Sequence, residues 1–453
     1  MKQIELINIS DCCGTKPQYL QGKPSQTGKK LPTAIIGAGP VGLAAAAHLA
    51  NREEPFILIE AGARVGTNIL QWGHVRLFSP WQYNLDKIAK QLLEKSGWVA
   101  PDSEQLPLGK EIVEDYLEPL ANLPEIYPNI LFNTTVTAVS KKGLDKMKNS
   151  NRKDAPFVLY LEQQGETRRM EVKAVIDATG TWSHPSPVNA DNSWTKAEKE
   201  LNKHIYYGIP DLTGAERERY MGKRVAVVGS GHSAINTILE LSQLGQQVEI
   251  YWIMRKENVE DAYGGQEKDA LQARGELGTR IHHLVDTGKV KAITPFHIHE
   301  LKHSDSGIEI IGEQNGEGFS LTGVGEIIAN TGSRPDFSFL REIRLSVDSA
   351  TESVAALSPL IDPNLHSCGT VRPHGEETLR QPERNFYIVG MKSYGRAPTF
   401  LMATGYEQVR SIVAYLTGDF ESAQKVELEL PGTGVCSTNL TSQNGGACCG
   451  SSC

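Results

Sequence analysis

The sequence predicts an α/β protein made of two related units with parallel sheets, the second inserted into the first. A strand, a glycine-rich turn and a helix follow one another twice, at 34–50 and at 224–244. An apolar strand that ends in Thr-Gly also occurs twice, at 174–180 and at 326–332. The strand at 386–391 has no counterpart in the second unit, so we expect the first unit to resume there.

Composition excludes several classes of protein. The chain has 453 residues, of which 39% are hydrophobic and 22% charged, so it can bury a core and is not a disordered protein. Its net charge of −8 gives no general attraction to nucleic acid or to an anionic membrane. The uncharged stretch 31–50 contains glycines and prolines that would break a helix in lipid, and the N-terminus lacks the long apolar segment of a secretory signal.

The cysteines are unevenly distributed. Six of the seven lie near the ends of the chain, and only Cys368 lies in its body. A disulfide scaffold would distribute its cysteines through the fold, so we expect a cytoplasmic protein. We predict no firm metal site, although Cys448, Cys449 and Cys453 can present soft thiolates to a thiophilic ion such as arsenic(III).

The predicted domain organisation follows from the repeats. Residues 1–30 form a flexible N-terminal arm, and residues 421–453 form a flexible tail that contains cysteines. The first domain comprises residues 31–189 and 325–420, and the second comprises residues 190–324. We expect both to be Rossmann-like dinucleotide-binding domains.

The first glycine-rich turn has the features of a pyrophosphate site. The first glycine makes a tight turn, the second lets the phosphates approach the backbone, and the third lets the helix and strand pack. The strand at 56–59 ends in Glu60, whose carboxylate suits a ribose 2′-hydroxyl. The turn residues expected to contact the cofactor are Gly37, Ala38, Gly39, Pro40 and Gly42.

The second glycine-rich turn predicts a different nucleotide. The strand that follows it ends in Arg255 and Lys256 instead of an acid. Cations at this position suit a ribose 2′-phosphate, which indicates NADP(H). The turn residues expected to contact it are Gly229, Ser230, Gly231, Ser233 and Ala234.

These motifs resemble those of the two-dinucleotide-binding-domain flavoproteins, in particular the flavin-containing monooxygenase and N-hydroxylase branch. The resemblance covers residues 31–420 and implies FAD in the first site and NADPH in the second. It also implies that the backbone of Val136 meets the adenine. The matching segments are Gly37–Gly42, Glu60, Gly66-Thr67 with Trp72, Asp177–Pro185 with Thr179 and Gly180, Gly229–Ala234, Asn330–Asp336, and Val389–Met391 with Gly390.

Three places bear on the assignment to that branch, two as departures from its pattern and one as support. The identifying sequence FxGxxxHxxxF/Y is reduced to His204. The stretch that carries a flavin-proximal Asn in the family offers Arg76 and Ser79, and Asn84 comes several residues later. Met391 replaces the Asp of related reductases, which favours the monooxygenase branch. Arg76, Ser79 and His204 are therefore the candidate catalytic residues.

The predicted function is that of an NADPH-dependent FAD oxidoreductase, specifically a monooxygenase. The resemblance implies a flavin hydroperoxide that attacks a small-molecule soft nucleophile (nitrogen, sulfur or a metalloid), with O₂ as co-substrate and a homodimer as one candidate assembly. A disulfide or metalloid reductase would need redox cysteines beside the flavin, and the body holds only Cys368, so that alternative depends on the C-terminal cysteines. A non-enzymatic redox- or metal-sensing flavoprotein is the third alternative.

Overall fold

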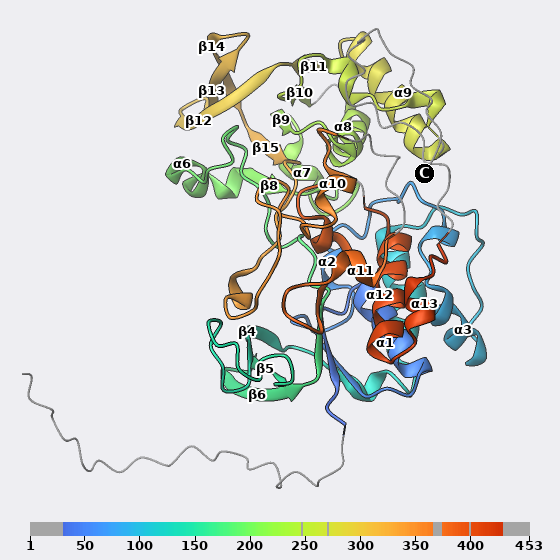
Figure 1. The fold of residues 1–453 in the computed structure, drawn as a ribbon. Helices are drawn as coiled ribbons and strands as arrows, with labels where there is room; N and C mark the ends of the chain where they lie inside the picture. Colours follow the sequence, from blue (N-terminus) through green and yellow to red (C-terminus); the bar gives the residue numbers. More distant parts are fainter. Residues whose placement is uncertain (1–29, 246–247, 270, 366–373, 398–399, 429–453) are drawn as a thin grey trace, which may run out of the picture.

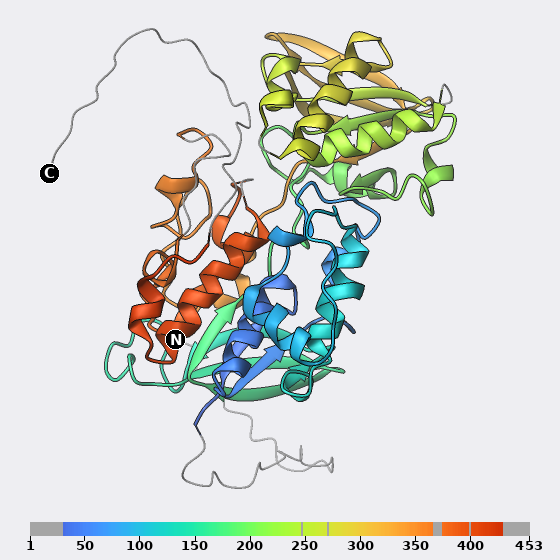
Figure 2. The same cartoon turned by 90° about the vertical axis from the view of Figure 1, so that its right-hand side faces the viewer.

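The computed structural model describes residues 30–245, 248–269, 271–365, 374–397 and 400–428. All seven cysteines lie outside these residues, and so does the predicted capture of a soft ion by Cys448, Cys449 and Cys453. Among the residues described, no helix is long and apolar enough to cross a membrane. Figure 1 and Figure 2 show two lobes, with the second unit above the first.

The first unit is built on a five-stranded parallel sheet in the order β16-β7-β1-β2-β3. β16 comes after the whole second sheet in the sequence, yet it pairs with β7. This pairing confirms that the first unit is interrupted and later resumed. The strands are β1 (Thr33–Ile36), β2 (Phe56–Ile59), β3 (Ile130–Leu131), β7 (Ala174–Asp177) and β16 (Phe386–Ile388).

The second unit has its own five-stranded parallel sheet in the order β11-β10-β9-β15-β8. β15 lies between β9 and β8, so residues 326–329 belong to the second sheet, whereas the predicted boundary at 325 placed them in the first. The repeat explains this difference, because β15 stands beside β9 as β7 stands beside β1. The strands are β8 (Ile205–Tyr207), β9 (Arg224–Val228), β10 (Glu249–Ile253), β11 (Val290–Ile293) and β15 (Glu326–Ala329).

Each unit also carries a three-stranded antiparallel sheet, just before the strand that ends in Thr-Gly. The alternation of apolar residues around 157–172 and 308–323 predicts a hairpin in each place, and the structure adds a third strand to both. The strands are β4 (Thr135–Lys141), β5 (Phe157–Gln163) and β6 (Glu166–Val172) in the first unit, and β12 (Phe296–Ser304), β13 (Gly307–Gln314) and β14 (Glu317–Val324) in the second.

The helix that follows the first glycine turn lies at the centre of the first unit. Ala44–Ala47 of α1 are fully buried, and their small side chains let α12 and α3 pack closely against it. The longer helices are α1 (Pro40–Asn51), α3 (Lys87–Lys95), α8 (His232–Gln243), α9 (Gln272–Asp286) and α12 (Met402–Leu416). The short ones are α2 (Thr67–Leu70), α4 (Gly109–Glu111), α5 (Glu118–Ala121), α6 (Lys196–Glu200), α7 (Arg217–Tyr220), α10 (Ser358–Ile361), α11 (Glu376–Leu379) and α13 (Phe420–Gln424).

Two chain segments cross between the units, and they are hydrogen-bonded to each other. The backbone N–H of Ser186 donates to the carbonyl of Gly332 at 2.9 Å, and that of Arg334 donates to the carbonyl of His184 at 2.8 Å. Paired in this way, the two crossings form a short antiparallel ribbon beside the first Thr-Gly turn. One crossing follows β7 and the other follows β15, so each begins a few residues after a strand that ends in Thr-Gly.

Candidate functional site

The first glycine-rich turn leaves an open cradle at the start of α1. A Cβ at Gly37 would lie 2.7 Å from the carbonyl oxygen of Ala178, and one at Gly42 would lie 1.9 Å from that of Gly37. In contrast, a Cβ at Gly39 would meet nothing within 4 Å. Gly39 is the N-cap of α1 and provides no side-chain cap, so the first N–H groups of the helix face this open space. The cradle suits a pyrophosphate.

Glu60 is held beside the cradle by the backbone. Its Oε2 accepts a hydrogen bond from the N–H of Ala38 at 2.7 Å, and its Oε1 accepts one from Gly62 at 2.7 Å. Each carboxylate oxygen retains a further lone pair. Glu60 lines two adjoining cavities, so its position suits a ribose hydroxyl between them.

The two cavities measure about 450 and 340 Å³ and share one wall around Gly37, Glu60 and Thr179. Val136 lines the smaller one, on the side expected to hold the adenine. Gly390 and Met391 line the far end of the larger one. The two adjoining cavities, with Val136 in the smaller one and Met391 in the larger one, provide a space that suits FAD.

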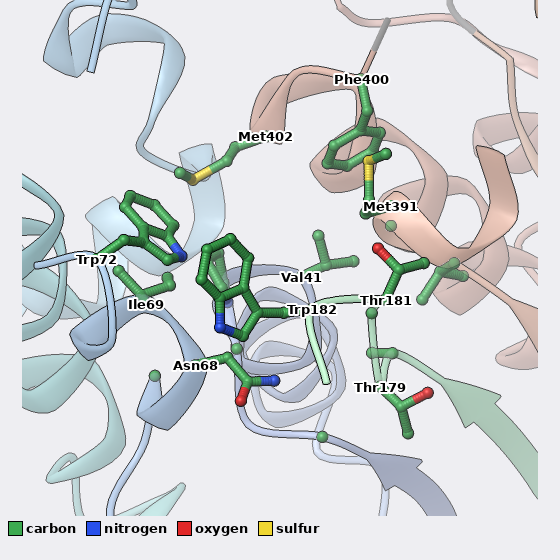
Figure 3. A pocket seen from close by; sticks show the side chains of 18 of the residues that line it. Val41, Asn68, Ile69, Trp72, Thr179, Thr181, Trp182, Met391, Phe400 and Met402 are labelled. Carbon is green, nitrogen blue, oxygen red and sulfur yellow. The ribbon is translucent and has the colours of Figure 1, made fainter. Parts of the chain in front are cut away.

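The far end of the larger cavity is apolar. Trp72 and Trp182 stand side by side with ring centroids 6.2 Å apart. Figure 3 shows Met402 on the side of Trp72, and Phe400 and Met391 on the opposite side of the pocket. The indole N–H of Trp182 donates to the Gln71 side chain at 2.8 Å, which fixes its ring. An apolar, aromatic end of this kind suits a flat ring such as that of a flavin.

Asn84 lines this cavity although sequence reasoning placed it too far along the chain. The 3₁₀ turn η1 (Trp81–Tyr83) reverses the backbone, and the N–H of Asn84 donates to the carbonyl of Trp81 at 2.9 Å. The turn brings Asn84 against Ser79, whose hydroxyl lies 3.1 Å from the Asn84 side-chain oxygen. The Ser-Pro step before Trp81 is the sequence signal for this reversal.

Lys392 is a second residue that sequence reasoning missed. It directly follows Met391, and its Nζ donates to Asp177 at 2.6 Å and to the Thr179 hydroxyl at 3.0 Å. The side chains of Lys392 and Asp177 are both 0% exposed. This buried ion pair joins the end of β16 to the Thr-Gly turn after β7.

The second glycine-rich turn lines a separate cavity of about 490 Å³. Gly229, Ser230 and Gly231 form one side, and Arg255 and Lys256 form another. A third cation on this cavity, Arg396, comes from the first unit and has no local sequence signal. Neither Ser233 nor Ala234 lines it; Ala234 is fully buried in α8.

The wall of the larger cavity contacts the second unit through Phe78. This residue lines the larger FAD-sized cavity, and its ring lies 5.4 Å from that of His232 at the start of α8. Arg274 of α9, paired with Asp269 at 2.6 Å, lies 5.9 Å from the same ring. Burial lowers the pKa of His232 to about 4, and the Arg274 charge adds to this effect, so the imidazole is neutral at physiological pH.

Arg76 and His204 line none of these cavities. The Arg76 guanidinium donates to the carbonyl of Leu106 at 2.5 Å. His204 lies next to the edge strand β8, with its Nδ1 3.6 Å from Glu326. Of the three predicted catalytic candidates, Ser79 alone stands in the larger cavity.

Comparison with known proteins places the chain in a family. Residues 34–370 match the family described as pyridine nucleotide-disulphide oxidoreductase, and the chain belongs to it. Ferredoxin–NADP reductase 2 of Bacillus subtilis is 24% identical over 224 residues, which are 48% of this chain and 59% of that protein. The chain thus spans less than two thirds of that relative.

Solved structures share the fold at low identity. The bacillithiol disulfide reductase Bdr (YpdA) from Bacillus cereus has a TM-score of 0.62 and 18% identity, covering 86% of this chain and 99% of that one. The cadaverine monooxygenase DfoA from Erwinia amylovora, bound to FAD, has a TM-score of 0.61 and 14% identity, covering 91% and 99%. The protein is an FAD- and NADP(H)-dependent oxidoreductase, which confirms the predicted fold class, enzyme class and cofactors.

Proposed function

We propose that the protein is an NADPH-dependent FAD monooxygenase that acts on a soft nucleophile in the cytoplasm. The observation that supports this most is the apolar, aromatic end of the larger cavity around Trp72, Trp182 and Phe400. Side chains of this kind exclude water from the reacting centre. The transfer of oxygen to a substrate requires such a water-free centre. None of the described residues that line this cavity is a thiol.

The proposal assigns roles to the chain's own residues. The N–H groups at Gly39 and the start of α1 bind the FAD pyrophosphate, Glu60 binds the ribose, and Val136 meets the adenine. Arg255, Lys256 and Arg396 bind the NADPH 2′-phosphate by charge-assisted contacts. Bound FAD supplies two-electron transfer from NADPH and the activation of O₂.

A reductase is the second candidate, because the family name and the fold shared with a disulfide reductase favour it. In that case Cys448, Cys449 and Cys453 would carry electrons to a disulfide or a thiophilic metalloid. Because the chain belongs to an oxidoreductase family, we do not propose a non-enzymatic sensor.

NADPH oxidation by the FAD-loaded protein, followed in air and under argon, separates the two candidates. The nucleophiles offered are a thioether, a primary amine and arsenite, and ¹⁸O₂ labels the product. We expect stimulation by one nucleophile in air only, with one labelled oxygen in the product. Turnover of a disulfide or metalloid under argon, lost when the chain is truncated after Gly432, would support the reductase instead.

A further inference from the structure

In the Ser79–Asn84 pair, the side-chain amide of Asn84 uses both of its hydrogens in hydrogen bonds within the protein. The amide nitrogen donates its two hydrogens to the carbonyl oxygens of Ser79 at 2.7 Å and Pro80 at 2.9 Å. Only an NH₂ group can face two carbonyl oxygens, so the amide orientation is fixed and its oxygen faces the Ser79 hydroxyl. Asn84 is 1% exposed and has no donor left for a ligand.

Ser79 is thereby restricted to one role. A hydroxyl carries one hydrogen, and that of Ser79 is donated to Asn84 Oδ1 at 3.1 Å. Its two lone pairs remain, and Ser79 lines the larger cavity together with Gly390 and Met391. Toward the cavity, Ser79 can accept a hydrogen bond but cannot donate one.

A hydrogen-bond acceptor interacts differently with the two redox states of a flavin. The central ring of a reduced flavin carries an N–H, whereas the same nitrogen in the oxidised ring presents a lone pair. We infer that Ser79 contacts the bound flavin and stabilises its reduced form, and that Asn84 is the positioning residue that keeps the hydrogen of the Ser79 hydroxyl turned away from the ring nitrogen, so that the oxygen accepts from it. This inference rests on the proposed placement of FAD and applies whether the reduced flavin meets O₂ or another acceptor.

The expected size follows from one neutral hydrogen bond. Losing it changes the ratio of the FAD dissociation constants of the two redox states by ~3- to 10-fold. For a two-electron couple a tenfold change corresponds to about 30 mV in the flavin potential.

The test is the midpoint potential of the bound flavin, measured anaerobically on the holoenzyme against a reference dye. We expect Ser79→Ala to lower the potential and Ser79→Thr, which keeps the hydroxyl, to restore it. We expect Asn84→Ala to lower it at least as far, because the freed Ser79 hydrogen can then turn to the oxidised ring.

A double-variant cycle shows whether Asn84 acts through Ser79. In the Ser79→Ala background, Asn84→Ala should leave the potential unchanged. An equal drop in both backgrounds would make Asn84 merely structural and overturn the inference. If Asn84→Ala does not fold, an unchanged potential in Ser79→Ala still overturns it. The measurement uses neither O₂ nor substrate, so its failure is distinct from failure of the proposed oxygenation.

Discussion

Gly39 and Gly42 stand three residues apart, and the structure predicts opposite consequences for the same substitution. A valine at 42 would place its Cβ 1.9 Å from the carbonyl oxygen of Gly37, so α1 cannot stay against β1. A valine at 39 meets nothing within 4 Å, and the backbone φ there is −81°, which any residue adopts. The Gly39 variant should therefore fold while its pyrophosphate cradle is filled.

The magnitudes differ accordingly. We expect Gly42→Val to cost ~3 kcal/mol or more of folding stability through overpacking, and Gly39→Val to change it by no more than about 0.5 kcal/mol. Loss of one charge-assisted hydrogen bond to the pyrophosphate, ~1.5–3 kcal/mol, weakens FAD binding by about 10- to 150-fold.

The assay measures FAD content after gel filtration, the dissociation constant by flavin fluorescence, and the thermal midpoint of the FAD-free protein. Gly318→Val is the matched control, because a Cβ there also meets nothing within 4 Å and Gly318 lines none of the three cavities. A Gly39→Val protein that folds and binds FAD within twofold of the unsubstituted chain would refute the placement of the pyrophosphate.

Three further predictions concern other parts of the chain. Arg255→Ala should raise the KM for NADPH ~10-fold or more and leave that for NADH nearly unchanged, since the lost contact is to the 2′-phosphate; equal losses in steady-state kinetics would make Arg255 structural. Lys392→Met should lower the free energy of unfolding by ~3–5 kcal/mol, because Asp177 is left buried and unpaired. In the same urea titration, Lys90→Met, which breaks an exposed pair with Glu94 at 3.8 Å, should cost less than ~0.5 kcal/mol. Burial raises the pKa of Glu240 from 4.5 to about 7, so the folded state holds this proton more tightly than the unfolded chain. The resulting stability is present below pH 4.5 and is lost as pH rises toward 7; Glu240→Gln should therefore stabilise the protein by ~1–2 kcal/mol at pH 7.5 and change nothing at pH 4. Parallel pH–stability curves for the two proteins would contradict this.

The sequence by itself determined the parts of this protein that are local. A pyrophosphate cradle needs a strand, a glycine turn and a helix in succession, so Gly37–Gly42 and Gly229–Ala234 could be recognised from consecutive residues. Glu60 after β2, and Arg255 and Lys256 after β10, could be recognised for the same reason. The unpaired strand at 386–391 also revealed the insertion, because it had no counterpart in the second unit.

The tertiary structure decided everything that depends on segments distant in sequence. Parallel pairing put β15 beside β9 and moved the domain boundary, and it left His204 at the edge strand, away from the cavities. Lys392 forms an ion pair with Asp177 only because β16 pairs with β7, although a whole unit is inserted between them in the sequence.

The same holds for the walls of the two sites. Arg396 reaches the second cavity from the first unit, and Phe78 meets His232 across the contact between the units. The sequence places Asn84 several residues after the expected position, so it was not a candidate. A single 3₁₀ turn brings its side chain within hydrogen-bond distance of Ser79. Phosphate binding uses the backbone of one continuous segment, whereas the flavin end is walled by side chains that only the packing of separate segments brings together.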